Sequence, residues 1–240
     1  MPGATAIALR SYPYSDTHKI VAFYTREWGP VSAKLPLRSN RTEAWCKLPA
    51  PLRILQIQCP RPPKSGFVNL NDVSLIGGLQ EGTTSPIKAG IAALVCEVAE
   101  QLVHKHPQDE ALFLFLYRTA LLLGELPSGG EANFHIAFLV ELLRVLGHMP
   151  PQDQLIIPLD KGFDLETLQP AGLSSRFVVP PQEARFIPLI SRITYGNMGH
   201  FLLNRRQRNR ITEHLLSFCR AQDTGIEHLR CLPVLQQLFI

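Results

Sequence analysis

The sequence has few cysteines and no long apolar run, and each absence excludes a class of protein. Its 240 residues include 5 cysteines, and none of them stands in a C-x-x-C pair. A zinc ribbon needs thiolates paired in this way, so we expect no metal site and reduced, mostly buried thiols. The apolar stretch at residues 111–123 is interrupted by Tyr117, Arg118 and Thr119, which excludes a membrane span of about 18 apolar residues.

Motifs of the common enzyme classes are also missing. No serine lies in a G-x-S-x-G elbow, and the segments GGLQEG and PSGGEA lack the GK[ST] of a P-loop. His104 and His106 are two residues apart, which places them on different faces of a helix. The sequence therefore predicts no catalytic residue and no cofactor, and an unrecognised hydrolase is an alternative with no motif behind it.

Charge is distributed unevenly along the chain. Residues 1–66 contain ten Lys and Arg against three Asp and Glu, a net charge of +7, whereas residues 67–240 carry a net charge of −3. Such a division favours a polyanionic partner for the N-terminal part. A solvated basic surface without a partner is the alternative that charge alone leaves open.

The first 78 residues have the pattern of short strands. Segments rich in β-branched and aromatic residues alternate with turn chemistry such as SYPYSD and EWGP. The expected strands are residues 5–10, 19–26, 31–35, 52–58 and 67–76. Several short strands within about 75 residues are typical of a small closed barrel.

A helical period begins after Gly78. Apolar residues recur at helical spacing, with Ser85-Pro86 as a start and Gly147 as a stop. The expected helices are residues 85–105, 109–126, 131–147, 204–221 and 231–240, with an irregular Pro/Gly-rich excursion and a hairpin at 148–187. We therefore expect an α+β protein with an N-terminal barrel domain at 1–78 and an α-helical domain at 79–240.

Basic and aromatic residues mix in the N-terminal part. A basic groove with aromatic platforms is the usual device for holding single-stranded nucleic acid, although strand aromatics such as Phe23 more often pack inward. Trp28 and Trp45 lie beside turn or loop residues and are the stacking candidates. The candidate DNA-binding residues are Lys34, Arg38 and Arg41, with Lys19 and Arg26 as weaker ones.

A second basic cluster, NRRQRNR, lies at residues 204–210. Arg206 and Arg210 are four residues apart on one helix face and form a further candidate DNA contact. A solvated helix start is the alternative, and the cluster taken alone favours it. Arginines in a first helical turn oppose the helix dipole, which adds some weight to a functional role.

Four segments together resemble the RecO family of bacterial recombination mediators. They are AIALRSYPYSDTHKIVAFYTREWGPVSAKLPLRSNR, LPAPLRILQIQ, FHIAFLVELLRVLGHMPP and HLRCLPVLQQLF, in the family's order and spread over nearly the whole chain. Two departures stand out. QDQLIIPLDKGFDLETLQ lacks the four cysteines of the zinc module found in many members, and LPLR replaces a K-G-x-R pattern.

The resemblance implies an N-terminal OB-fold and a helical domain. It also implies binding to single- and double-stranded DNA, annealing of complementary strands, and loading of RecA together with RecR and the C-terminal tail of single-stranded DNA-binding protein. On this chain, Lys34, Arg38 and Arg41 match the family's basic stretch. With no signal-peptide pattern at the N-terminus, we expect a cytoplasmic, nucleoid-associated protein. The alternative is a protein-interaction scaffold whose basic barrel contacts acidic protein partners and not DNA.

Overall fold

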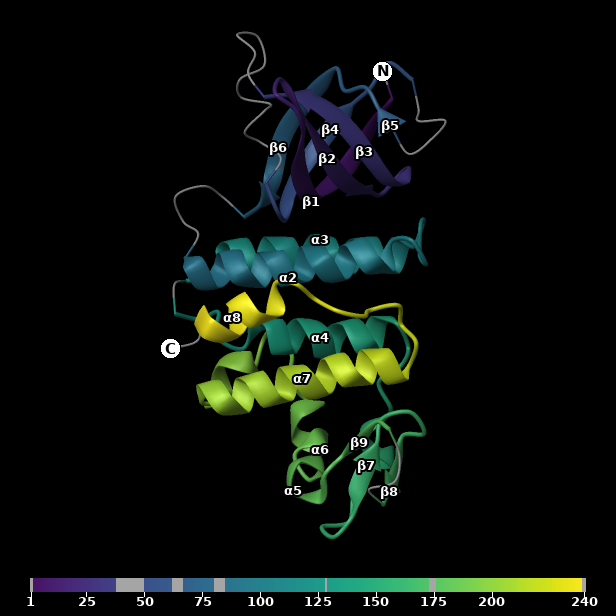
Figure 1. Cartoon of the computed structure of the whole chain (residues 1–240), viewed down its shortest axis with the longest axis vertical. Coiled ribbons are helices and arrows are strands. Elements are labelled where there is room, and N and C mark those ends of the chain that lie inside the picture. Colours follow the sequence, from purple (N-terminus) through teal and green to yellow (C-terminus); the bar gives the residue numbers. More distant parts are fainter. Residues whose placement is uncertain are drawn as a thin grey trace. The chain divides into compact units, whose positions relative to one another are not determined.

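The chain combines a β region with a helical region, which confirms the predicted α+β class (Figure 1). The computed structural model describes residues 2–37, 50–61, 67–79, 85–127, 129–172 and 176–238. These fall into two compact units, Met1–Glu131 with Leu229–Leu238, and Ala132–His228. The predicted domain boundary at residue 78 stays a prediction.

Six strands of the first unit form the OB-like barrel. They are β1 (Gly3–Ser15), β2 (His18–Thr25), β3 (Gly29–Pro36), β4 (Arg53–Gln58), β5 (Phe67–Val68) and β6 (Asp72–Gly78). Their order is β5-β3-β2-β1-β4-β6, with β5 parallel to β3 and the other pairs antiparallel. Because β5 and β6 are consecutive in the chain but lie at opposite ends of this order, the short connection between them requires the sheet to curve, as in a barrel.

Alternation along the strands divides the barrel into an inner and an outer face. Successive side chains of a strand point to opposite faces, and alternate residues of the first part of β1, of the middle of β2 and of β3 belong to the buried barrel core. Phe23 is 1% exposed in that core, which confirms that it packs inward. The other members include Ala4, Ala6, Ala8, Val21, Val31, Ala33, Leu35, Leu55 and Ile57.

β1 is longer than the sequence indicates. SYPYSD reads as a turn, but β1 continues to Ser15 and the turn is confined to Asp16–Thr17, so that prediction was wrong. β1 pairs with β4 only over Gly3–Ile7, and its far half pairs with β2 alone. Pro13 lies in this far half, where a residue without an N–H is tolerated because one strand edge is unpaired.

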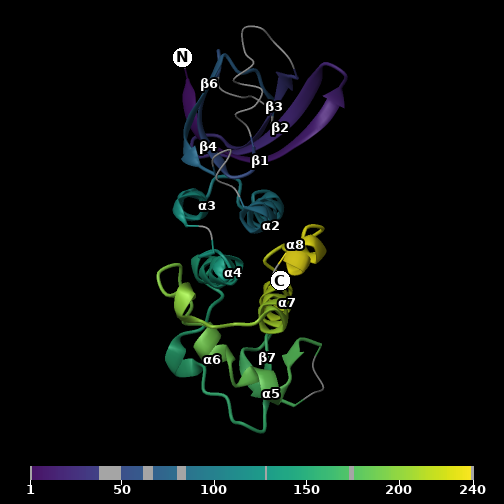
Figure 2. The ribbon, with the colours of Figure 1, turned by 90° about the vertical axis from the view of Figure 1, so that its left-hand side faces the viewer.

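Three helices complete the first unit. They are α2 (Pro86–Leu102), α3 (Glu110–Glu125) and α8 (Leu232–Leu238). Ser85 and Asp109 cap α2 and α3 by accepting hydrogen bonds from backbone amides three residues on, as predicted for Ser85. Figure 2 shows α2 and α3 end-on, lying next to each other, and α2 also packs on β1 and α8.

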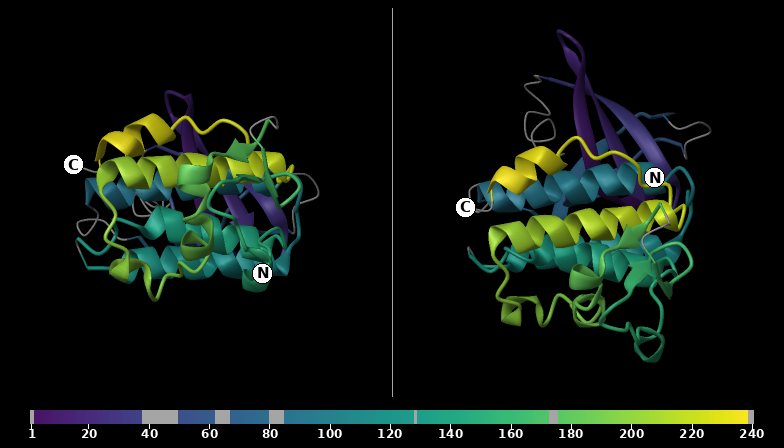
Figure 3. Two further views of the ribbon diagram at one scale, coloured as in Figure 1. Left: turned by 90° about the horizontal axis from the view of Figure 1, so that it is seen from below. Right: turned by 60° about the horizontal axis from the view of Figure 1, so that its bottom comes forward.

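The second unit is built on two helices and a small sheet. α4 (Phe134–Val145) packs along α7 (Arg205–Ala221), as Figure 3 also shows. α4 ends before Gly147, whose φ of 76° suits glycine. The excursion at 148–187 contains the predicted hairpin. Its elements are η1 (Gln152–Gln154), β7 (Gly162–Asp164), β8 (Gln169–Ala171), β9 (Val178–Val179) and α5 (Pro181–Ala184), and α6 (Ile187–Ile190) and η2 (Met198–His200) follow.

The described cysteines are free thiols and mostly buried, as the sequence predicts. Cys59, Cys96 and Cys219 are buried and Cys231 is half-buried, and all four are free thiols; Cys46 lies outside the described residues. Burial raises the pKa of the Cys96 and Cys219 thiols to about 12, so they are neutral at ordinary pH. No helix among the described residues is long and apolar enough to cross a membrane.

Candidate nucleic-acid interface

The outer face of the barrel carries a patch of exposed aromatic and basic side chains. Strand register places Tyr12, Ile20 and Lys34 in one row across β1, β2 and β3, so their side chains share the outer face. Tyr14 follows two residues after Tyr12, and the Lys34 ammonium lies 4.6 Å from the centroid of its ring. We call Arg10, Tyr12, Tyr14 and Lys34 the outer-face set.

Exposure distinguishes this set from the other strand aromatics. Tyr12 and Tyr14 are 40% and 60% exposed, whereas Ile20 beneath them is buried. The Arg10 guanidinium lies 5.7 Å from the Tyr12 ring centroid, which makes a second cation–aromatic pair. Two basic groups held beside two exposed rings can neutralise phosphates and stack unpaired bases.

A third exposed ring lies on the same face. Phe67 on β5 is opposite Ser32 of β3, and Ser32 and Lys34 are two residues apart on the strand. Residues two apart point to one face, so Phe67 belongs with the outer face, where it is 59% exposed. The usable aromatic surface therefore extends from β1 across β3 to β5.

The predicted DNA-binding residues of the barrel do not share one face. Lys34 is exposed on the outer face, but Lys19 is opposite Leu35, a residue of the inner core, and so points the other way. Arg26 is paired with Glu110 through an Nη2–Oε1 contact of 2.6 Å. This pair reduces the charge that Arg26 offers to a phosphate.

The other predicted contacts of the barrel are one arginine pair and two tryptophans. Arg38, Arg41 and Trp45 lie outside the described residues. Trp28 is half-buried and packs against the barrel core, and its backbone N–H donates to the Thr25 hydroxyl at 3.1 Å. It is therefore held as part of the turn between β2 and β3, with only part of its ring open to a ligand.

Sequence reasoning did not assign Arg10, Tyr12, Tyr14 or Phe67 to the site. The turn chemistry of SYPYS hides the signal that could find them, which is the alternation of Tyr12 with Ser11 and Pro13. In a strand that continues to Ser15, Arg10 and Tyr12 share a face by their spacing alone.

The second unit contains an apolar pocket of about 800 Å³. Its walls come from α4, α6, α7 and the segment before α7, and they are mostly aliphatic and aromatic. Among the lining residues are Val140, Ile187, Leu203, Ile211, Leu215 and Phe218. The last three recur at helical spacing along α7, so this apolar stripe faces the pocket.

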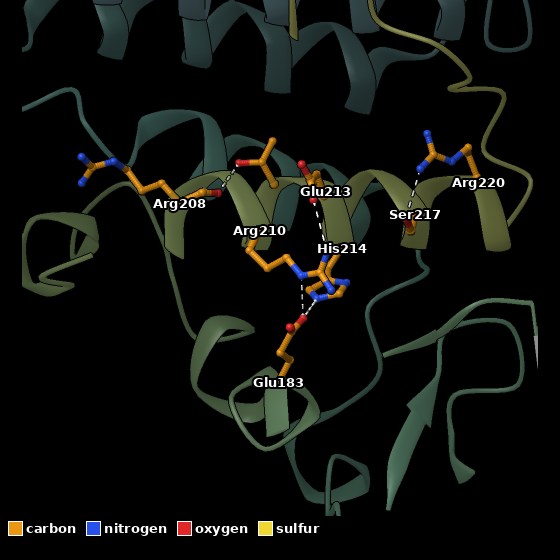
Figure 4. Close-up of polar contacts among 8 residues, drawn as sticks. Glu183, Arg208, Arg210, Glu213, His214, Ser217 and Arg220 are labelled. Carbon is orange, nitrogen blue, oxygen red and sulfur yellow. Dashed lines mark hydrogen bonds and ion pairs between the residues drawn. The ribbon is translucent and has the colours of Figure 1, made fainter. Parts of the chain in front are cut away.

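Polar side chains gather on the α5–α7 side of this pocket. Glu183 of α5 accepts a hydrogen bond from the Arg210 Nε at 2.9 Å and also contacts the His214 Nε2. Figure 4 shows Arg210 and His214 reaching from α7 toward Glu183, while Arg208 points away from them. Burial alone would raise the pKa of Glu183, but the hydrogen bonds from Arg210 and His214 lower it below its ordinary value, so the carboxylate is charged at neutral pH.

The two predicted arginines of α7 have different environments. Both line the pocket, so the structure brings them together as the i,i+4 spacing predicts. Arg210 is occupied by Glu183 and lies 3.6 Å from Glu213. Arg206 is exposed, and no ion pair from it is found within the described part of the chain. Arg206 is therefore the guanidinium most available to a ligand carboxylate or phosphate.

No cluster of metal-ligating side chains is found among the residues that the structure describes. They contain no group of three His, Cys, Asp or Glu side chains able to hold a metal ion. His135 is fully buried on α4, and burial, with the nearby charge of Arg208, lowers its pKa to about 3. A neutral, enclosed imidazole of this kind contributes to packing and is closed to a substrate.

Comparison with known proteins gives one consistent result. Residues 84–224 match the family model described as "Recombination protein O C terminal". The chain is 28% identical to the DNA repair protein RecO of Porphyromonas gingivalis strain W83 over 246 residues, covering 98% of this chain and 97% of that protein. The DNA repair protein RecO of Bacteroides fragilis (strain ATCC 25285) is 26% identical, over 97% of this chain and 97% of that protein. The DNA repair protein RecO of Flavobacterium psychrophilum is 24% identical, over 98% of this chain and 97% of that protein.

Proposed function

This chain belongs to the RecO family of DNA repair proteins, and from that membership we propose that it acts as a recombination mediator. In this proposal it binds single- and double-stranded DNA, anneals complementary strands, and helps to load RecA together with RecR. Annealing needs only that the protein hold both strands and screen the repulsion between their phosphates. It requires no nucleotide hydrolysis and no catalytic group.

The observation that carries DNA binding is the outer-face set. Lys34 lies on β3, and the two tyrosines lie in the part of β1 that leads into the turn to β2. The face of strands 2 and 3 and the loop between strands 1 and 2 commonly form the oligonucleotide surface of an OB-fold. Arg10 is also 3.7 Å from Glu100, so part of its charge is already compensated. Lys34 is therefore the phosphate contact that we favour, and Tyr12 and Tyr14 are the base platforms.

The first test measures DNA affinity of outer-face variants. Binding of a fluorescent single-stranded oligonucleotide is followed by anisotropy across a salt series, for wild type, Tyr12→Ala, Tyr14→Ala and Lys34→Ala. We expect each tyrosine variant to bind about tenfold more weakly, because stacking contributes about 1–3 kcal/mol per base. Lys34→Ala should also reduce the log–log salt slope by about 0.7, the value for one phosphate contact on a single strand.

Phe177→Ala is the matched control for this test. Phe177 is paired with Arg176, whose guanidinium carbon lies 5.2 Å from the ring centroid, but this pair belongs to the second unit. The Phe177→Ala substitution should leave the affinity for the oligonucleotide unchanged. If all outer-face variants bind DNA as wild type does, the interface assignment is wrong. If wild type itself does not bind at low salt, the protein-scaffold alternative takes precedence.

The pocket of the second unit supports the proposed protein partner. An acidic tail with apolar residues needs an apolar pocket with cations at its rim, and Arg206 and Arg210 supply these cations. We therefore propose that the C-terminal tail of single-stranded DNA-binding protein binds here. Titrating a fluorescent tail peptide into wild type and Arg206→Glu tests this, and the variant should bind at least tenfold more weakly.

A further inference from the structure

The pocket already contains a carboxylate of the protein's own. Of the described residues that line it, Glu183 alone is acidic, and it is bonded to Arg210 and His214 on the facing helix. These are two of the groups that an acidic ligand would use. Resting on the proposed tail-binding function, we propose that Glu183 competes with the carboxylates of the acidic peptide for Arg210 and His214, and so sets the pocket's affinity.

The geometry shows what this competition involves. Glu183 lies in α5, a helix of four residues that begins at Pro181, and α7 carries both of its partners. The Glu183 side chain is 34% exposed and that of Arg210 51% exposed, so the pair is reachable from solvent and can be exchanged for a ligand carboxylate. Figure 4 shows a single Glu183 oxygen between the Arg210 guanidinium and the His214 ring.

Arg206 gives the incoming peptide its first contact in this scheme. It lines the same pocket one helical turn before Arg210 and is exposed. An acidic peptide would meet Arg206 directly, whereas at Arg210 its carboxylates meet the negative charge of Glu183, which already holds the Nε. Glu183 therefore lowers affinity for acidic peptides, and it discriminates against weakly acidic ones that cannot displace it.

The test is a double-mutant cycle in which charges are removed from the protein and from the peptide, and the peptide affinity is measured for each combination. The probes are the tail peptide of single-stranded DNA-binding protein and a version with its Asp and Glu side chains replaced by Asn and Gln. We expect Glu183→Gln to bind the acidic peptide about threefold to fivefold more tightly than wild type, the range that half-exposed ion pairs allow. The amide version should show no gain. Arg210→Gln combined with Glu183→Gln should remove the gain.

Glu213→Gln is the matched control. Glu213 also pairs with Arg210, at 3.6 Å, and the substitution removes the same charge, but Glu213 does not line the pocket. The affinity of Glu213→Gln for the acidic peptide should stay within about 1.5-fold of the wild-type affinity, because an exposed ion pair has only a small coupling energy.

The outcomes separate this inference from the proposed function. If wild type binds the tail but Glu183→Gln binds it equally or more weakly, Glu183 positions Arg210 for the ligand and the competition model is wrong, while the tail site stands. Equal gains for both peptides, or an equal gain in Glu213→Gln, also overturn the model. If no variant binds the acidic peptide, the tail site itself is wrong and the inference falls with it.

Discussion

Tyr24 shows how a residue with the chemistry of a stacking platform can instead serve the interior. Its side chain is 1% exposed, and its hydroxyl lies 3.1 Å from the carbonyl oxygens of His106 and Asp109 and accepts a hydrogen bond from the Asp109 N–H. Burial raises the pKa of this phenol, so it remains a donor at neutral pH. The hydroxyl links β2 to the start of α3.

Removing that hydroxyl should weaken the first unit. In Tyr24→Phe the buried backbone groups of residues 106–109 lose a partner, and we expect the free energy of unfolding to fall by about 1–2 kcal/mol. Urea unfolding followed by tryptophan fluorescence measures this, because Trp28, one of the two tryptophans, packs on the barrel core. Tyr117→Phe is the control, since Tyr117 packs near Phe113 and no hydrogen bond from its hydroxyl is found among the described residues. Similar losses in both variants would contradict the role of the hydroxyl.

At the scale of residues, the sequence predicts which groups are present and not which face they take. Lys19 and Lys34 are equivalent by composition, yet strand register sends them to opposite faces of the barrel. Arg26 reads as a free cation because its partner Glu110 is 84 positions away. Such pairings depend on tertiary contacts, so spacing along the chain cannot reveal them.

At the scale of elements, the sequence predicts most strands and helices. Their apolar periods and caps are local, as Ser85 and Gly147 show. The failure at SYPYS has a nonlocal cause. Proline disfavours a strand that is paired on both sides. Pro13 is tolerated because β4 pairs only with the first part of β1, so β1 has a single neighbouring strand at Pro13. The pocket was missed for a similar reason, because its walls come from segments between Val140 and Phe218.

The docking of α8 depends on one carboxylate of α2. Glu97 accepts hydrogen bonds from the backbone N–H groups of Arg230 and Cys231, at 2.8 and 3.0 Å. Burial alone would raise the pKa of Glu97, but bonds from the Cys231 thiol and from these two amides lower it below its ordinary 4.5. A carboxyl whose folded pKa is depressed stabilises the fold above its unfolded pKa, and this contribution is lost as pH falls through the folded pKa.

Glu97→Gln should therefore be destabilised most at neutral pH. We expect its Tm to lie below that of wild type at pH 7, because a neutral amide accepts hydrogen bonds more weakly than a carboxylate. The gap should begin to narrow as pH falls below the unfolded pKa of about 4.5, and it should close as pH falls through the lower folded pKa, where the wild-type carboxyl is protonated as well. Circular dichroism melts at pH 7 and pH 3 measure it, with Glu125→Gln as a charge-matched control. A gap of the same size at both pH values would show that the carboxylate charge has no part in holding α8.

At the scale of the whole molecule, the two proposed binding surfaces belong to two compact units. The first unit contains the basic residues 1–66 and the outer-face set, and the second unit contains the apolar pocket lined by Arg206 and Arg210. Under the proposed function the protein holds DNA and a protein partner at once, and separate surfaces would allow both. Charge asymmetry in the sequence predicts the first surface, while the second depends on walls that only the fold brings together.

This division predicts that the two affinities can be changed independently. Tyr14→Ala should weaken binding of single-stranded DNA about tenfold and leave the affinity for the acidic tail peptide unchanged. Arg206→Glu should do the reverse. The sequence also predicts Arg206 and Arg210 as DNA contacts, and the same measurements decide that point. If Arg206→Glu weakens DNA binding as much as it weakens tail binding, the arginine rim serves both ligands, which would then compete for it. In that event, adding tail peptide should displace a bound oligonucleotide from wild type but not from Arg206→Glu, whereas independent surfaces would let both ligands remain bound together.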